Sequence, residues 1–429
     1  MNETHDNIPK AERALLVGIE LDAVKKEEAL SLLHELAGLA KTLGLEVADS
    51  ISVKLREKTS ALLVGTGKAD EIVAIAKAED ADSIVFDYPL TPSQQRNWEK
   101  LSGKKVYDRS ELIIKIFSSR ALTKEASLQV ELAQLEFALP RLAHSYEDLS
   151  RQRGGRYGTK GSGEQKLELD RRTIERRIHD IKDELKDVRK SRDVQRRRRE
   201  RIELPRAAIV GYTNAGKSSL LNALTAANVL AEDKLFATLD PTTRKLILTS
   251  GSTLLITDTV GFVRNLPHNL VEAFKATLEE ASASDLLIHV ADASDPEVEI
   301  HMATTEKVLD EIGAGAVPRI LVLNKADIAE SGVVEQWRRL HPDSLAVSAK
   351  TGLGLDALAT QIEARLTSGM VEMELAIPFA EYSLIPLIHR EGTVLEERTE
   401  DDCTVVRCKV PQRIVPKLEP YAGGKELKA

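Results

Sequence analysis

The sequence of 429 residues predicts an α/β chain that is divided into several domains. Three observations predict this class. An apolar run at 207–210 leads through a glycine-containing turn into a helical pattern that begins at Ser219. Over the first 120 residues, short apolar runs alternate with amphipathic stretches, as in a small α/β sheet. Between these two regions, apolar residues recur at alternating spacings of four and three, which is the pattern of paired helices.

The turn after the run 207–210 has the spacing of a phosphate-binding loop, G-x-x-x-x-G-K-S. Backbone N–H groups of such a loop surround an anion, and the following helix dipole adds to their field. We expect Lys217 to place its charge between the β- and γ-phosphates of a nucleotide, and Ser218 to offer its hydroxyl to Mg²⁺. A strand–turn–helix corner that binds no ligand can have the same local pattern. The residues further along the chain must therefore distinguish the two interpretations. The predicted loop contacts are Gly211, Tyr212, Thr213, Asn214, Ala215, Gly216, Lys217, Ser218 and Ser219.

A second apolar run, 254–256, leads to Asp258 and Gly261 in the order D-T-V-G. A carboxylate delivered beside a phosphate loop can hold Mg²⁺ through water. The N–H of Gly261 is then placed to sense a γ-phosphate, so we assign a catalytic role to Gly261 together with Lys217.

Two more apolar runs, 320–323 and 344–347, end in residues that fit guanine. The Asp327 carboxylate can accept two hydrogen bonds from the guanine edge, whereas adenine would present an acceptor and leave the carboxylate unmatched. The Ala349 N–H is expected to reach guanine O6. The predicted base contacts are Asn324, Lys325, Asp327, Ser348, Ala349 and Lys350. Four motifs in this order predict a domain that binds and hydrolyses GTP.

Composition excludes several other classes of protein. The chain is 42% hydrophobic and has no apolar run of about 18 residues, so we expect no insertion into a membrane. The first residues are polar and unlike a signal peptide, and Cys403 and Cys408 lack metal-site spacing, so we expect a cytoplasmic location with buried thiols. The net charge is −8, yet residues 151–206 carry 20 Lys and Arg against 11 Asp and Glu. Such a segment indicates one defined surface for a polyanion.

The apolar seams predict two antiparallel helices that pack on each other, one from Leu128 to Leu142 and the other from Ile174 to Val188. Pro140 predicts a kink or break near the end of the first helix. The glycine-rich tip between the helices offers cations to RNA phosphates and an aromatic ring to an unpaired base. An inert spacer between domains is the alternative. The predicted RNA contacts are Arg151, Arg153, Arg156, Tyr157 and Lys160.

The expected organisation is therefore a P-loop GTPase domain, preceded by a small α/β domain with a long antiparallel helical hairpin and followed by a small α+β domain. The boundaries are 1–120, 121–204, 205–369 and 370–429. In the first domain we expect strands at 14–19, 45–53, 61–64 and 83–86, and helices at 29–40, 72–76 and 92–101. In the last domain we expect strands at 375–379, 393–397 and 404–410, and a helix at 382–389.

The four motifs resemble translation-factor-class GTPases, nearest to the Era, Obg and TrmE group. The hairpin segments 129–135, 149–152 and 166–172 extend the resemblance to the HflX family of ribosome-associated GTPases over almost the whole chain. The resemblance implies a GTP-dependent factor that inserts its hairpin near the peptidyl-transferase centre of the large ribosomal subunit and splits or rescues ribosomes. We expect the protein to act as a monomer. Assembly of the large subunit and regulation of a protein partner are the alternatives.

The resemblance also suggests roles for individual residues. In the candidate first switch, 234–244, it selects Thr238 as a catalytic residue and Mg²⁺ ligand beside Ser218 and Asp258, with Thr242 and Thr243 as alternatives. Asn214 resembles a position that some TrmE-like GTPases use for K⁺. Phe262 stands where Ras-like proteins have a glutamine that orients water, so intrinsic hydrolysis should be slow unless a partner or ion assists.

Overall fold

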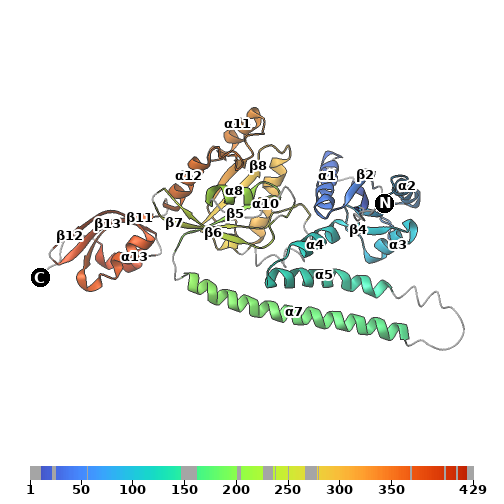
Figure 1. The fold of residues 1–429 in the computed structure, drawn as a ribbon, viewed down its shortest axis with the longest axis horizontal. Coiled ribbons are helices and arrows are strands. Elements are labelled where there is room, and N and C mark those ends of the chain that lie inside the picture. The colour runs from blue at the N-terminus through green and yellow to red at the C-terminus, as the bar shows by residue number, and fades with distance from the viewer. Residues whose placement is uncertain are drawn as a thin grey trace, which may run out of the picture. The chain divides into compact units, whose positions relative to one another are not determined.

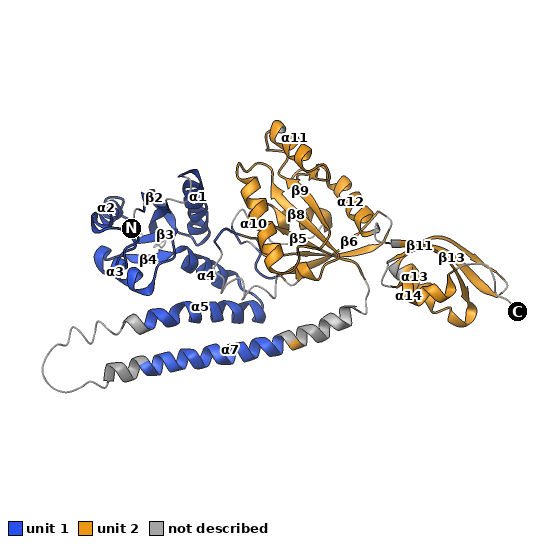
Figure 2. Cartoon of the chain, turned by 180° about the vertical axis from the view of Figure 1, so that it is seen from behind, with its two compact units in different colours: residues 1–189, 232–240, 263–276 blue, residues 190–231, 241–262, 277–429 orange. Residues whose placement is uncertain are grey.

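In the computed structural model the chain forms two compact units, 1–189 with 232–240 and 263–276, and 190–231 with 241–262 and 277–429 (Figure 2). Two short segments of the expected GTPase domain are thus grouped by their contacts with the N-terminal unit. The structure describes residues 11–21, 26–55, 57–145, 162–200, 204–225, 235–236, 238–249, 251–265, 278, 280–367, 370–400, 402–411 and 414–422.

Unit 1 is built on a parallel four-stranded sheet in the order β2-β1-β3-β4 (Figure 1). Its strands are β1 (Arg13–Glu20), β2 (Glu46–Lys54), β3 (Ser83–Phe86) and β4 (Lys105–Asp108), and its helices are α1 (Lys26–Thr42), α2 (Thr66–Ala78), α3 (Pro92–Ser102) and α4 (Arg109–Arg120). Three predicted strands and all three predicted helices are confirmed. The strand β4 and helix α4 were not predicted. Trp98 and Phe86, whose ring centroids are 4.9 Å apart, centre the core on one face of the sheet.

The strand predicted at 61–64 is wrong. This segment is a turn closed by a pair of hydrogen bonds between Thr59 and Leu63, and Leu63 has a left-handed backbone with φ of 69°. The segment packs against α3, where Trp98 Nε1 donates to the Leu62 carbonyl at 2.8 Å and Asn97 Nδ2 donates to the Ala61 carbonyl at 2.9 Å. Side chains of α3 therefore satisfy the carbonyl groups that a sheet ladder would otherwise have used.

The predicted hairpin helices are α5 (Lys124–Ser145) and α7 (Ser162–Glu200), which lie side by side in both views (Figures 1 and 2). Leu128, Ile181 and Leu185 are buried at their seam, as the four-three spacing predicted. The helix α5 continues past Pro140 to Ser145, so the proline does not break it. The glycine-rich tip lies outside the described residues.

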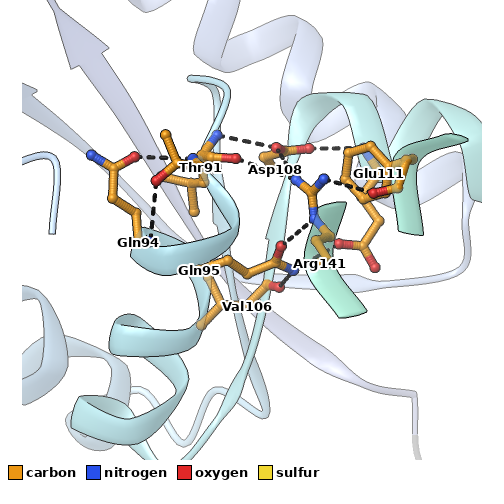
Figure 3. A network of polar contacts seen from close by, with 9 residues as sticks. Thr91, Gln94, Gln95, Val106, Asp108, Glu111 and Arg141 are labelled. Atoms are coloured by element: carbon orange, nitrogen blue, oxygen red, sulfur yellow. Dashed lines mark hydrogen bonds and ion pairs between the residues drawn. The ribbon is translucent and has the colours of Figure 1, made fainter. Parts of the chain in front are cut away.

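A polar network fastens α5 to the N-terminal sheet (Figure 3). From α5, Arg141 donates to Gln95 of α3 at 2.8 Å and to the Leu90 carbonyl at 3.2 Å. It also lies 3.5 Å from the buried carboxylate of Asp108. Asp108 in turn accepts hydrogen bonds from the N–H groups of Leu90 and Glu111. The network therefore holds the tip-facing end of α5, four residues before Ser145, to this unit.

Unit 2 contains a six-stranded sheet in the order β10-β9-β8-β5-β7-β6 (Figure 1), parallel except for the edge strand β6. Its strands are β5 (Arg206–Gly211), β6 (Thr242–Ile247), β7 (Thr253–Asp258), β8 (Leu286–Asp292), β9 (Arg319–Asn324) and β10 (Leu345–Ala346), and its helices are α8 (Lys217–Thr225), α10 (Val298–Glu311), α11 (Ser331–Leu340) and α12 (Leu355–Thr367). The apolar runs before all four predicted motifs are strands of this one sheet. Because β5, β7, β8, β9 and β10 are parallel, their carboxyl ends, which carry the motifs, share one edge.

The C-terminal residues form a three-stranded antiparallel sheet in the order β11-β13-β12, which confirms the predicted strands and helix. The elements are β11 (Met370–Pro378), η1 (Phe379–Glu381), α13 (Leu384–Glu391), β12 (Thr393–Thr399), β13 (Cys403–Pro411), α14 (Val415–Leu418) and η2 (Glu419–Tyr421). Both cysteines are buried free thiols, as predicted. Among the described residues, no helix is both long and apolar enough to cross a membrane.

Candidate nucleotide-binding site

The phosphate loop connects the central strand β5 to the start of α8, as its sequence spacing predicted. Gly216 has φ of +89°, and a Cβ there would lie 2.2 Å from Asn324 Nδ2, so no other residue fits without displacing the Asn324 side chain. Asn214 also has a left-handed backbone and is exposed. One contact of the loop could not be predicted from the sequence. The Tyr212 ring stacks on His301 of α10, with 3.8 Å between the ring centroids.

Lys217 is folded back into this loop. Its Nζ donates to the Tyr212 carbonyl at 2.7 Å, and the residue is 6% exposed. Burial lowers the pKa of Lys217 to about 8, although the charge of Asp258 acts in the opposite direction. A nucleotide phosphate beside this ammonium group would favour its charged form.

The predicted Mg²⁺ ligands Ser218 and Asp258 meet at the carboxyl edge of the sheet. Ser218 Oγ donates to Asp258 Oδ2 at 2.6 Å, and Asp258 is fully buried at the end of β7. A hydroxyl and a carboxylate are the oxygen ligands that Mg²⁺ prefers, so this pair fits the ion. The adjacent Thr259 hydroxyl is used elsewhere, since it donates to the Ile209 carbonyl at 2.8 Å.

The segment after Asp258 lies against the phosphate loop. Phe262 donates its N–H to the Gly211 carbonyl at 3.1 Å, and its own carbonyl accepts from the Thr213 N–H at 2.8 Å. These bonds bring Gly261 so close that a Cβ on it would lie 2.8 Å from Lys217 Nζ. The two residues predicted to act on the γ-phosphate are therefore neighbours. The Phe262 side chain is buried and carries no hydrogen-bonding group.

At the base-recognition end, Asn324 ties two motifs to the phosphate loop. Its Nδ2 donates to the Ala215 carbonyl at 2.8 Å, and its Oδ1 accepts the Ala349 N–H at 3.0 Å. The sequence predicted that the Ala349 N–H donates to guanine O6. In this structure it donates to Asn324 instead. Asp327 is exposed on the turn after β9, where a base could reach it.

The other predicted base contacts have defined surroundings. Lys325 Nζ pairs with Asp292 at the end of β8, with 2.6 Å between Nζ and Oδ2. Ser348 is fully buried and its Oγ accepts the Thr351 N–H at 3.1 Å, which shapes the turn after β10. Lys350 is exposed beside it.

The described residues of the candidate first switch up to Asp240 belong to unit 1 and make contacts within it. The Phe236 ring meets Phe117 of α4 edge-on, with 4.6 Å between the ring centroids, and Asp240 accepts hydrogen bonds from the N–H groups of Leu122 and Thr123, just before α5. Thr238 belongs to this segment, so its placement beside Ser218 and Asp258 stays a prediction. Both alternatives lie in β6 instead: Thr243 Oγ1 is 2.9 Å from Thr257 Oγ1, and Thr242 pairs with Asp258 in the β6–β7 ladder.

Just after Phe262, Arg264 also joins unit 1. Its Nε lies 3.1 Å from Glu35 of α1, and its Nη2 donates to Ser31 at 2.6 Å. Glu35 pairs in turn with Arg109, which pairs with Asp87, and all four charged side chains are less than a tenth exposed. No sequence pattern indicated this buried network. The predicted RNA contacts 151, 153, 156, 157 and 160 lie outside the described residues.

Fold and site together define a P-loop GTPase: a strand, phosphate loop and helix, with a carboxylate and the predicted base-recognition motif at other strand ends on the same edge of the sheet. Comparison with known families agrees along most of the chain, from residue 31 to residue 419. Residues 31–118 and 120–199 match the N-terminal and middle regions of a GTP-binding GTPase family, 206–325 match the 50S ribosome-binding GTPases, and 334–419 match the HflX C-terminal domain.

Curated relatives extend this similarity. GTPase HflX of Akkermansia muciniphila is 44% identical, with 98% of this chain and 99% of the relative covered. GTPase HflX of Escherichia coli is 39% identical, with 93% of each covered. Among solved structures, a GTP-binding protein of Sulfolobus solfataricus in complex with GDP matches 83% of this chain at 26% identity and a TM-score of 0.44. The chain belongs to the HflX family of GTPases, and it hydrolyses GTP.

Proposed function

We propose that this GTPase binds the large ribosomal subunit through its helical hairpin and uses GTP to split or rescue ribosomes. The observation that carries the proposal is the anchored hairpin. The Arg141 network holds α5 to the N-terminal sheet, and the apolar seam holds α7 to α5. A hairpin whose helices are held to each other and to the N-terminal sheet can carry a cationic tip into a crevice lined by phosphates. The ribosome-binding family model that matches 206–325 supports the same class of partner.

For hydrolysis, the proposal assigns the residues of unit 2 as follows. The phosphate loop and Lys217 bind the phosphates, and the Gly261 N–H donates a hydrogen bond to the γ-phosphate. Ser218, Asp258 and, after rearrangement of the first switch, Thr238 would hold Mg²⁺, which when bound neutralises phosphate charge. Because Phe262 cannot orient water, we expect slow intrinsic turnover, which a partner or a K⁺ ion near Asn214 would accelerate. Equal rates of GTP turnover in NaCl and KCl would refute the proposed role of K⁺.

Two experiments test the ribosomal role. Light scattering by intact ribosomes should fall when the protein is added with GTP or a non-hydrolysable analogue, and should stay constant with GDP. If subunits do not separate while GTP turnover is intact, splitting is refuted. Binding to precursor particles but not to mature large subunits would instead support an assembly role.

The second experiment isolates the hairpin tip. One variant replaces four tip cations by Gln, and a matched control replaces four exposed cations elsewhere, so that the net charge changes equally. The tip set is Arg151, Arg153, Arg156 and Lys160, and the control set is Lys77, Lys307, Arg338 and Arg339. We expect the tip variant alone to lose ribosome-stimulated turnover, with basal turnover kept. The salt dependence of its ribosome binding should weaken by about three units of slope. Equal behaviour of both variants would refute an RNA-facing tip.

A further inference from the structure

The Thr213 hydroxyl in the phosphate loop is buried without a hydrogen-bond partner among the described residues. The residue as a whole is 5% exposed. Buried hydroxyl groups are normally paired, because an unpaired one loses its hydrogen bonds to water without replacement. Valine has the same shape and would avoid this loss. A threonine at this position therefore suggests a partner that arrives with the nucleotide.

The position of Thr213 indicates what that partner is. A Cβ placed on Gly261 would lie 2.8 Å from Thr213 Cα, 3.1 Å from Thr213 Cβ and 2.8 Å from Lys217 Nζ. Thr213 is also fixed from the other side, because its N–H donates to the Phe262 carbonyl at 2.8 Å. The hydroxyl-bearing carbon thus shares one small space with the ammonium group and the glycine that are expected to contact the γ-phosphate.

The neighbouring residue explains why another group is needed. A GTPase that uses water as its nucleophile requires a polar group to hold that water in line with the γ-phosphorus. Phe262 has no such group, and its ring is 2% exposed. A threonine hydroxyl can accept a hydrogen bond from water and donate one to a phosphate oxygen at the same time. Thr213 thus has the chemistry that Phe262 lacks.

We propose that Thr213 is a further catalytic residue, whose hydroxyl contacts the attacking water and orients it beside Gly261. The water oxygen forms a bond to the γ-phosphorus, and the bond from that phosphorus to the β–γ bridging oxygen breaks. The proton of the water passes to phosphate, while Thr213 gains and loses no proton overall. The inference rests on the proposed phosphate-loop site and is independent of ribosome binding.

The test compares Thr213→Val, which removes the hydroxyl, with Thr213→Ser, which keeps it. The control Thr225→Val removes a hydroxyl from α8 that donates to the Leu221 carbonyl. Three quantities are measured: the single-turnover rate of GTP hydrolysis, the Kd for a fluorescent GDP, and the Tm. We expect Thr213→Val to slow hydrolysis about 100-fold. Its Kd for GDP should stay within about twofold, because GDP lacks the γ-phosphate. Its Tm should equal or exceed that of the wild type, because an unpaired buried hydroxyl is removed.

Thr213→Ser should keep most of the hydrolysis rate, and the control should match the wild type. A Thr213→Val rate within threefold of the wild type would overturn the proposal. So would a Thr213→Ser rate as low as that of Thr213→Val, because the methyl group would then be what matters. A parallel loss of GDP affinity or a lower Tm would reveal a structural role and overturn it as well. Failure of the wild type to bind GDP would instead refute the phosphate-loop site, so the two failures are distinguishable.

Discussion

Replacing Arg109 by Met should destabilise unit 1 strongly at neutral pH and less strongly in acid. Arg109 Nη1 lies 2.7 Å from Asp87 Oδ1, and its Nη2 lies 2.8 Å from Glu35 Oε2. Methionine keeps much of the side-chain volume but removes the charge. Glu35 would keep Arg264 as a partner, whereas Asp87 would lose Arg109, with which it forms its ion pair among the described residues.

The magnitude follows from this burial. Removing one member of a buried ion pair typically costs about 3–5 kcal/mol, because the remaining charge is left uncompensated. We expect about 3 kcal/mol at pH 7.5. Burial already raises the pKa of the Asp87 carboxyl to about 6 in the wild type, even though Arg109 opposes the shift. Without Arg109 the pKa of Asp87 should rise further.

The sign of the pH dependence can be derived from this shift. The folded state binds a proton at Asp87 more tightly than the unfolded state, whose pKa is near 4, so stability falls as pH rises through this range. The unfavourable contribution of Asp87 is complete above its folded pKa. Since that pKa should be higher in the variant, acidification to pH 5.5 should recover part of the loss caused by Arg109→Met.

The assay exploits the two tryptophans of the chain, because Trp98 is buried in unit 1 and Trp337 lies in unit 2. In a Trp337→Phe background, the fluorescence of Trp98 in a urea titration reports the unfolding of unit 1. Arg177→Met is the matched control, because Arg177 pairs with Glu131 at a half-exposed surface, and its urea midpoint should not change measurably. The reasoning is refuted if Arg109→Met costs less than about 1 kcal/mol at pH 7.5, or if acid recovers nothing.

Three further predictions concern the nucleotide site. Asp327→Asn should weaken GTP binding about 100-fold and improve binding of XTP, measured by competition with fluorescent GDP, because the amide now matches the xanthine carbonyl; unchanged GTP affinity would contradict the assigned base contact. Gly216→Ala should abolish nucleotide binding through its clash with Asn324, whereas Gly313→Ala, with a similar positive φ but open space, should not; equal effects would mean that only backbone strain matters. Because the pKa of Lys217 is lowered to about 8, its charge is lost as pH rises above 8, and phosphate binding restores it. Calorimetry at pH 8.5 in buffers of different ionisation enthalpy should therefore show uptake of more than about half a proton per GDP, and zero uptake would contradict the buried, depressed lysine.

Much of the nucleotide site could be predicted because its information is local. The strand before Gly211 and the strands before Asp258 and Asn324 are short apolar runs, and parallel strands bring their carboxyl ends to one edge. The packing of the two hairpin helices could be predicted for a similar reason, because apolar residues at alternating spacings of four and three indicate a helix that packs against another helix. The strand predicted at 61–64 failed because apolar residues alone cannot distinguish a ladder from a turn whose carbonyls are bound by Asn97 and Trp98.

The class of ligand follows from the sequence alone, because glycine spacing, a lysine and carboxylates at strand ends have few other chemical uses. The partners of these groups could be seen only in the fold: Ala349 donates to Asn324, Phe262 pairs with the phosphate loop through its backbone, and Thr213 is buried beside Gly261. The fold also decided that charged residues such as Arg109 are buried. The physical reason is that periodicity records which face of an element is apolar, whereas pairing depends on atoms that folding brings together from distant parts of the chain.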